Sequence, residues 1–431
     1  MSPSALALVS QTAAEALAAP ENVAGVRPEQ NGGSLLAAAG LQLLHMGLPA
    51  RNSDAGAEFL PYGKQEISVA DIKAVVEALC SGWLTTGPRV AEFENAFARH
   101  VGAREGAAVN SGTAALHCAT RALRIQPGDE VIVPAITFAA SANTIVYEGG
   151  TPVFADVEPD TLLIDPVSVA AKITPRTKAI VAVDYAGQPA DYDALKQLAA
   201  DRGIRLIADA CHAPGATYRG RMTGTLADIS CFSFHPVKHL TTCEGGMAVT
   251  DDVEMAAHMR RFRNHGIDSD HRTRQASGAH AYDMGELGFN YRLPDVQCAL
   301  GMSQLERLEQ WVVMRQHIAS LYEEALAGMA EVVPLKTHAD RTNAYHLYVV
   351  KLAEGIDRDL VFARMRDEGI GVNVHYAPVH LHSYYQARGY EPGLAPVAEE
   401  VSKRILTLPM FPAMRAADVA RVVAALTRAT A

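Results

Sequence analysis

The sequence predicts an α/β protein with one large, mostly parallel sheet, followed by a smaller α/β domain at the C-terminus. From residue 106 onward, short apolar runs alternate with segments of helical periodicity. Apolar strands that alternate with helices favour a parallel sheet covered on both faces. A long helical pattern then runs from Pro294 to Leu326, and a helix of this length commonly links two domains.

The 431 residues divide into three predicted regions. Residues 1–58 are rich in Ala, Ser, Gly, Pro and Asn and carry no basic residue before Arg27, so we expect a poorly ordered extension rather than a secretory signal. Residues 59–300 are expected to form the large domain, and residues 301–431 the linking helix and the small domain.

Two helices are predicted before the sheet begins. Ser68 and Asp71 have the spacing of a capping box, and the apolar face that follows predicts a helix that ends near Ser81. Residues 83–88 form a predicted loop, and a second helical pattern runs from Val90 to His100.

The predicted sheet follows from the period of the apolar residues. Strands are expected at residues 106–109, 130–133, 152–155, 179–184, 205–208, 229–234 and 247–250, with helices at 113–123, 141–147 and 192–201. In the small domain, strands are expected at 345–352 and 372–375, and helices at 360–368, 397–405 and 416–429.

The stretch Asp228–Thr250 contains the residue on which the functional prediction depends. Pro236 has no N–H and ends the strand before it, and Gly245 begins a tight turn into the next strand. Lys238 therefore lies at a strand exit between two apolar segments, where loss of hydration would lower its pKa. A neutral amine can attack a carbonyl and hold it as a Schiff base, although most lysines in loops are simply exposed.

Three other segments supply what a phosphate-bearing aldehyde cofactor needs besides a lysine. Ser111-Gly112-Thr113 precedes a helical pattern, and N–H groups at a helix N-terminus bind anions, although Ser and Thr there are often plain caps. Asp209 ends an apolar strand, and a carboxylate there can keep a pyridine nitrogen protonated. His212 follows three residues later, and Ser233 precedes the lysine by five.

These motifs resemble those of the DegT/StrS family of nucleotide-sugar aminotransferases. The resemblance rests on Ser-Phe-His-Pro-Val-Lys238 with Glu-Gly-Gly246, on Asp209-Ala-Cys-His212, and on Gly288-Phe-Asn-Tyr-Arg-Leu-Pro-Asp295. It covers the chain from about Phe59 to the C-terminus. It implies a PLP-dependent transferase of fold type I, with the aspartate aminotransferase-like architecture and pyridoxal 5′-phosphate (PLP) as cofactor.

The resemblance assigns roles to individual residues. It makes Lys238 and Asp209 the catalytic pair, and its cofactor-binding positions are Gly112, Thr113, Phe138, Asp209, His212, Ser233, Lys238 and Asn290. Its substrate-binding positions are Tyr62, Trp83, Thr85, Gln188, Arg292 and His375. The segment with Asn290 and Arg292 reaches the neighbouring subunit's phosphate in the family, so the resemblance implies a homodimer with shared active sites.

The resemblance also implies the reaction, in which an amino group moves from L-glutamate to a nucleotide-linked keto-sugar and 2-oxoglutarate is formed. The motifs are most similar to those of C4 aminotransferases that act on UDP-4-keto-6-deoxy-N-acetylhexosamines, as in the pseudaminic-acid pathway. The alternatives are a C3 aminotransferase for a dTDP-keto-sugar and a cyclitol aminotransferase. A PLP-dependent sugar dehydratase carries histidine in place of Lys238, and a non-catalytic binding protein would not need Lys238 and Asp209 together.

Composition narrows the classes of partner and compartment. The net charge of -10 argues against nucleic-acid binding as the main role, and no apolar run approaches the ~18 residues that predict a membrane span. The six cysteines form no C-x-x-C pair, which favours reduced thiols and a cytoplasmic protein. A metal site is the alternative for the histidines between residues 375 and 382, but this run resembles a small-domain segment of the family that binds no metal.

Overall fold

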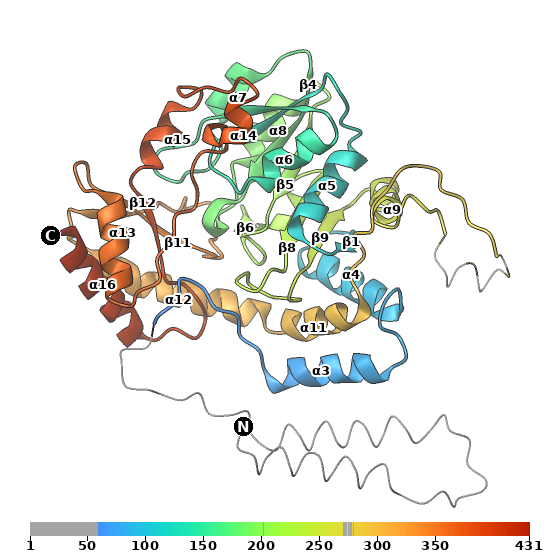
Figure 1. Cartoon of the computed structure of the whole chain (residues 1–431), viewed down its shortest axis with the longest axis horizontal. Coiled ribbons are helices and arrows are strands. Elements are labelled where there is room, and N and C mark those ends of the chain that lie inside the picture. Colours follow the sequence, from blue (N-terminus) through green and yellow to red (C-terminus); the bar gives the residue numbers. More distant parts are fainter. Residues whose placement is uncertain (1–58, 201, 270–273, 275–277, 279) are drawn as a thin grey trace, which may run out of the picture. The chain divides into compact units, whose positions relative to one another are not determined.

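The computed structural model describes residues 59–200, 202–269, 274, 278 and 280–431. The extension predicted for residues 1–58 lies outside the described residues. Figure 1 shows the described chain as helices packed around a central sheet.

The central sheet has seven strands in the order β1-β9-β8-β5-β4-β2-β3. They are β1 (Glu105–Val109), β2 (Glu130–Pro134), β3 (Thr151–Ala155), β4 (Thr177–Val183), β5 (Arg205–Asp209), β8 (Ile229–Ser233) and β9 (Gly246–Thr250). Neighbouring strands from β3 to β8 are parallel, and β9 alone pairs antiparallel with both β8 and β1. The predicted large, mostly parallel sheet is thus confirmed.

Helices cover both faces of the sheet, and successive residues of central strands such as β4 are accordingly apolar and buried. Along β4, Ala179, Val181 and Val183 pack into one core and Ile180 and Ala182 into another. The first core includes residues of α5 (Gly112–Ala122), α6 (Ala140–Tyr147) and α9 (Val253–Phe262). The second includes residues of α4 (Pro88–His100), α7 (Pro166–Lys172), α8 (Tyr192–Ala200) and α11 (Asp295–Leu305).

The predicted capping box starts the first described helix, α3 (Val69–Cys80). The backbone N–H of Ser68 donates to Asp71 at 2.7 Å, and the N–H of Asp71 donates to the Ser68 hydroxyl at 3.3 Å. Asp71 also accepts hydrogen bonds from Ser303 and Gln304 of α11, at 2.7 and 2.8 Å. One carboxylate therefore caps α3 and fastens it to α11.

The single helix predicted from Pro294 to Leu326 is wrong, because the structure has two helices, α11 and α12 (Leu308–Leu326). The backbone leaves helical geometry at Arg307, with φ −111° and ψ 0°. The Arg307 guanidinium bonds to Asp71 and lies 4.6 Å from the ring centroid of Trp311. The residue at which the two helices separate thus forms an ion pair with the distant helix α3.

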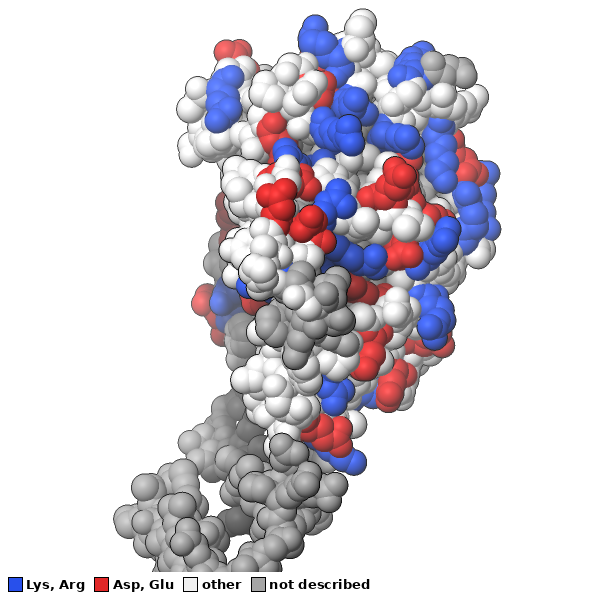
Figure 2. Space-filling model, turned by 90° about the vertical axis from the view of Figure 1, so that its right-hand side faces the viewer, with Lys and Arg blue, Asp and Glu red and all other residues white. Residues whose placement is uncertain are grey.

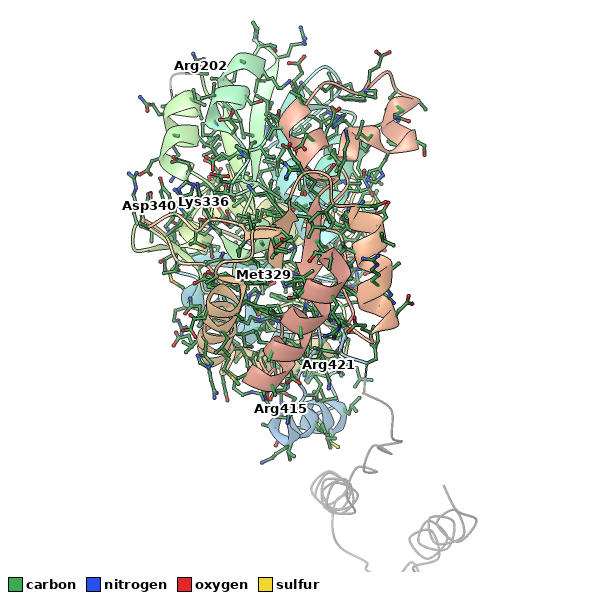
Figure 3. The ribbon with its side chains drawn as sticks, turned by 90° about the vertical axis from the view of Figure 1, so that its left-hand side faces the viewer. Arg202, Met329, Lys336, Asp340, Arg415 and Arg421 are labelled. Atoms are coloured by element: carbon green, nitrogen blue, oxygen red, sulfur yellow. The ribbon has the colours of Figure 1, made fainter. Side chains whose placement is uncertain are left out.

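The C-terminal part has its own antiparallel sheet, in the order β10-β11-β12. Its strands are β10 (Val332–Pro334), β11 (Tyr348–Leu352) and β12 (Ile405–Leu408). They form a third core with α12, α13 (Arg358–Asp367) and α16 (Ala416–Thr430). Figure 3 labels Arg421 on α16 and Lys336 on the segment after β10. The domain boundary near residue 300 stays a prediction.

Two predictions for this region were wrong. Residues 372–375 form no strand, and only Asn373 makes a single bridge, to Thr407. The helix predicted for residues 397–405 is α15 (Pro396–Val401), and Ile405 already belongs to β12. A short apolar run fits a helix or a buried strand equally well, and pairing with β11 decides the outcome here.

The charges, helices and possible metal ligands of the described residues bear on which partners the chain could bind. Figure 2 shows basic and acidic side chains interspersed over the described part of the face that it presents. Among the described residues, no helix is both long and apolar enough to cross a bilayer. The same residues contain no group of three or more His, Cys, Asp or Glu arranged to hold a metal ion.

Candidate active site

A cavity of about 480 Å³ opens where the parallel strands end. Its wall includes Val183 of β4, Asp209 of β5 and Ser233 of β8, each at the carboxyl end of its strand. Phe138 after β2 and Gly112 after β1 complete this edge. Parallel strands bring their carboxyl ends to one edge, which is where ligands of such sheets bind.

Lys238 lies on a turn between β8 and β9 that is closed at its base. The N–H of Phe234 donates to the Gly245 carbonyl at 2.8 Å, and the N–H of Thr242 donates to the Phe234 carbonyl at 3.0 Å. From α11, the Gln297 amide donates to the Thr242 and Glu244 carbonyls at 2.8 and 2.7 Å. The turn is therefore fixed from behind, and the Lys238 side chain lines the cavity.

The cavity wall shields the Lys238 amine from bulk water. Desolvation lowers the pKa of Lys238, and the nearby Asp209 carboxylate opposes this effect. A lower pKa leaves a larger fraction of the amine neutral, which is the form that attacks a carbonyl.

Asp209 is held with its carboxylate at the cavity wall. The side chain is 6% exposed, and its residue ends β5 near the middle of the sheet. The Ser141 hydroxyl donates to Oδ2 at 2.6 Å, and the Cys211 N–H donates to Oδ1 at 3.3 Å. These bonds fix the direction in which the carboxylate can meet a ligand.

The turn before α5 forms a cradle in which only glycine fits. A Cβ built on Gly112 would lie 2.8 Å from Cβ of Ser233, and a Cβ on Gly246 would meet the Ser111 carbonyl. The Ser111 hydroxyl accepts from the Ala114 N–H at 3.0 Å, so this serine is the N-cap. The first N–H groups of α5 and the Ser233 hydroxyl thus lie side by side at the cavity, as phosphate binding requires.

His212 is buried at the cavity wall between two other rings. Its Nε2 lies 3.3 Å from the Tyr376 hydroxyl, and its ring centroid is 4.4 Å from that of His346. Burial lowers the pKa of His212 well below its usual value, and the positive charge of Lys238 lowers it further. Its Nδ1 is buried without a partner within the described chain, so a ligand in the cavity could supply one.

Three more predicted residues meet in the cavity. Phe138 is 57% exposed and faces Tyr376, with ring centroids 6.1 Å apart. Tyr62 lies against His375 at 5.5 Å. His375 is fixed by Thr407 at 2.9 Å from Nδ1, and burial lowers its pKa to about 3.

Five predicted residues do not line the cavity. Trp83 and Thr85 are exposed on the loop between α3 and α4. Asn290 is exposed, and Arg292 donates to Asn264 at 2.9 Å. Gln188 is buried, so the structure gives no support to its predicted contact with the substrate.

The Gln188 amide has a structural use. It donates to the Lys336 carbonyl at 3.0 Å and accepts from the His338 N–H at 2.7 Å. Its neighbour Tyr185 instead reaches the site, because the Tyr185 hydroxyl donates to the His375 carbonyl.

His346 and Asn373 are among the polar cavity residues that were not predicted as site residues. His346 contacts His212, 134 positions away in the chain by subtraction of the two residue numbers. Asn373 accepts from the Val374 N–H at 2.8 Å and lies 3.4 Å from Nε2 of His375. For His346 and for Asn373, the local sequence shows only a polar residue within a segment predicted to be a strand.

The geometry fits pyridoxal phosphate. The α5 turn offers N–H donors to a phosphate, Asp209 offers a carboxylate to a ring nitrogen, and Lys238 offers an amine to the aldehyde. Phe138 offers an aromatic face. A cavity of this size, with few polar groups that converge, is typical of a small-molecule site.

Comparison with known proteins agrees with this geometry. The model of the DegT/DnrJ/EryC1/StrS aminotransferase family matches residues 65–427. The spore coat polysaccharide biosynthesis protein SpsC of Bacillus subtilis (strain 168) is 43% identical over 374 residues, which cover 85% of this chain and 96% of SpsC.

Solved structures are similar over nearly their full length. The putative sugar aminotransferase Spr1654 from Streptococcus pneumoniae, in its PMP-form, superposes with a TM-score of 0.82 at 32% identity, covering 86% of this chain and 99% of that one. Helicobacter pylori PseC, an aminotransferase involved in the biosynthesis of pseudoaminic acid, gives a TM-score of 0.81 at 29% identity, covering 86% and 99%.

Proposed function

The chain belongs to the DegT/DnrJ/EryC1/StrS aminotransferase family and is a PLP-dependent sugar aminotransferase, and we propose that it transfers the amino group of L-glutamate to C4 of a UDP-linked 4-keto-6-deoxy-N-acetylhexosamine. One observation supports the PLP-dependent amino transfer in this proposal above the others. A single cavity brings together Lys238, Asp209 and the N-terminus of α5.

The cofactor, when bound, supplies an electron-withdrawing ring that makes the neighbouring carbon of an attached amine acidic. Lys238 would hold the aldehyde carbon of the cofactor, and its amine, when free, would carry the proton to and from the substrate carbon. Asp209, oriented by Ser141, keeps the ring nitrogen protonated. Gly112, Thr113 and Ser233, which line the same cavity, would bind the phosphate, and Phe138 would cover one face of the ring.

The proposed sugar pocket lies on the side of the cavity lined by Tyr62 and His375. His375 has a fixed orientation, since Thr407 and the hydroxyl of Tyr185 both bond to its residue. A neutral imidazole and a phenol suit hydroxyl and keto groups of a sugar, which need hydrogen bonds rather than charge. The similarity to PseC, an aminotransferase involved in the biosynthesis of pseudoaminic acid, supports a substrate of that pathway, for which the sequence motifs imply amination at C4.

The proposed active form is a homodimer with shared active sites. Near Asn290 and Arg292, the described segment carries large exposed apolar side chains: Tyr282 (60% exposed), Met284 (55%) and Leu287 (73%). Several large exposed apolar side chains within one short segment are typical of an interface between proteins. A second copy seated there would bring Asn290 to the cofactor phosphate and Arg292 to the substrate of its neighbour.

Cofactor attachment is tested by absorbance and mass spectrometry. Wild-type protein reduced with borohydride should carry the cofactor covalently on Lys238, and Lys238→Ala protein should carry none. The outcome that contradicts the assignment is equal labelling of both proteins, or labelling at another lysine.

The substrate is tested with glutamate and a panel of keto-sugars, with the aminated carbon located by NMR. The proposal requires turnover of the UDP-4-keto-6-deoxy-N-acetylhexosamine with nitrogen at C4. Faster turnover of a dTDP-3-keto-sugar or a keto-cyclitol would replace it with one of the alternatives.

A further inference from the structure

His117 lies in the middle of α5, is 2% exposed, and is enclosed by four aromatic rings. The ring centroids lie 5.2 Å away for Tyr147, 5.1 Å for Phe262, 5.2 Å for Phe289 and 5.8 Å for Tyr291. A buried imidazole needs partners for both nitrogens, and apolar packing alone would not select it.

Both nitrogens of His117 are satisfied by side chains from other segments. Nε2 lies 2.9 Å from Glu148 at the end of α6, and Nδ1 lies 3.0 Å from the Tyr291 hydroxyl. Burial raises the pKa of Glu148, but hydrogen bonds from His117 and Arg121 outweigh it and hold that pKa below its usual value. An ionised Glu148 only accepts, so Nε2 carries a proton, and in neutral His117 the Tyr291 hydroxyl donates to Nδ1.

The same network holds the start of the segment that contains Tyr291. Arg121, one turn beyond His117 on α5, donates to Glu148 at 3.2 Å and to Glu286 at 3.4 Å. Glu286 also lies 2.8 Å from Nε2 of His258 on α9. Residues 286–292 are thus fastened to α5, α6 and α9 by side chains that are partly or fully buried.

The backbone of this segment is fixed in register. The Asn110 N–H donates to the Tyr291 carbonyl and the Tyr291 N–H donates to the Arg263 carbonyl, both at 2.9 Å. Arg292 forms an antiparallel bridge with Val109, the last residue of β1. Residues 289–292 therefore run in extended form beside the start of α5.

Extended backbone places alternate side chains on opposite sides. Phe289 and Tyr291 share the side that faces α5, and their rings stack at 5.0 Å with an interplanar angle of 14°. Asn290 and Arg292 lie on the other side, where Asn290 is exposed and the Arg292 guanidinium donates to Asn264 of the same chain at 2.9 Å. The packing of Phe289 and Tyr291 against α5 therefore determines on which side Asn290 and Arg292 lie.

We propose that His117 and Tyr291 are positioning residues that aim Asn290 and Arg292 at the active site of the second subunit. This inference rests on the homodimer with shared sites in the proposed function. In this proposal, helix α5 contributes to both active sites of the dimer. Gly112 at its start holds the phosphate of its own subunit. His117 follows five residues later, about 7.5 Å along the same helix.

The test uses hybrid dimers of differently tagged chains. One chain keeps Lys238, and the other carries Lys238→Ala, so only the first develops the visible absorbance of cofactor joined to lysine. Tyr291→Phe or His117→Leu is then added to the Lys238→Ala chain, and the dissociation constant for PLP is measured at the intact site. Tyr147→Phe is the matched control, because it removes a hydroxyl from another ring on His117 and leaves the Nδ1 contact in place.

The inference predicts that Tyr291→Phe in the partner chain weakens PLP binding at the intact site about tenfold, as expected for one lost hydrogen bond that positions a ligand contact. His117→Leu should weaken it at least as much, and Tyr147→Phe should have no effect. With Tyr291→Phe moved to the chain that keeps Lys238, the binding constant should stay at its wild-type value, since that site receives its loop from the other chain.

The inference would be overturned if Tyr291→Phe or His117→Leu weakened PLP binding only when it was placed in the chain that keeps Lys238. The two residues would then support only the site of their own subunit. Asn290→Ala in the partner chain tests the premise separately. If it leaves PLP binding unchanged, or if the chains form no dimer, the shared-site proposal fails. If Asn290→Ala acts across the dimer and both positioning variants do not, only the positioning inference fails.

Discussion

Gly112→Ala tests the structural reason for glycine in the phosphate cradle. The added Cβ would lie 2.8 Å from Cβ of Ser233, 3.2 Å from its Oγ and 3.3 Å from Sγ of Cys211. Carbon atoms in contact settle at about 3.5–4.0 Å, so the turn or Ser233 must move by about 1 Å.

A displacement of about 1 Å stretches a phosphate hydrogen bond beyond its useful range of about 3.2 Å. One hydrogen bond to a charged group contributes about 2 kcal/mol, so PLP should bind about 30-fold more weakly to Gly112→Ala protein. The assay is titration of cofactor-free protein with PLP, followed by visible absorbance.

The cause is isolated by a double-mutant cycle with Ser233→Gly, which removes the side chain that the new Cβ would strike. In the Ser233→Gly background, Gly112→Ala should weaken binding by less than about threefold, because the main clash is gone. Equal losses in both backgrounds would refute the steric argument. Gly112→Ala protein that binds PLP as tightly as wild type would refute the cradle itself.

Three further predictions concern buried ionisable groups. Asp209→Asn should lower turnover by about 100-fold or more while PLP stays bound, since a group that stabilises charge in the transition state is lost; steady-state rates and the absorbance of bound cofactor check this, and unchanged turnover would contradict it. Burial holds the pKa of His239 well below 6.5 in the folded protein. As pH falls below 6.5, His239 therefore becomes protonated in the unfolded chain but not in the folded one, and the folded state loses stability. His239→Gln should make the pH profile of unfolding free energy shallower by about 1.4 kcal/mol per pH unit in this window, as measured by urea denaturation. Asp184 changes stability with pH in the opposite direction from His239. Burial raises the pKa of Asp184 from 3.8 to about 7, so the wild type loses stability as pH rises between these values. Asp184→Asn keeps an oxygen for the Ala190 N–H and the Tyr192 hydroxyl, and its stability relative to wild type should rise with pH in that window; a constant difference would show that Asp184 does not titrate there.

Several site predictions depended on local pattern and agree with where the structure places the residues. Asp209 ends a strand whose five residues are Arg-Leu-Ile-Ala-Asp, and Gly112 follows a strand and opens a helix. The fold-type prediction is confirmed by the parallel sheet and by the solved sugar aminotransferases that superpose on it. The roles given to individual residues stay predictions.

Other predictions failed where packing overrides local preference. The helical pattern across residues 294–326 breaks at Arg307, because a guanidinium there bonds to Asp71 in a helix more than 200 residues away. The contact of Gln188 with a sugar, which the family resemblance implies, stays a prediction, and the amide of Gln188 already bonds to the backbone after β10.

The sequence by itself determined the alternation of strands and helices, the apolar faces, and the lysine, aspartate and glycine that mark the cofactor site. These depend on periodicity and backbone chemistry within a few residues, so they can be recognised locally. Only the tertiary structure decided that His346 lies against His212 and that His117 bonds to Tyr291, 174 positions away. Contacts between residues so far apart in the chain depend on how the layers of helices and strands pack. The local sequence around one residue does not identify the residue that it contacts.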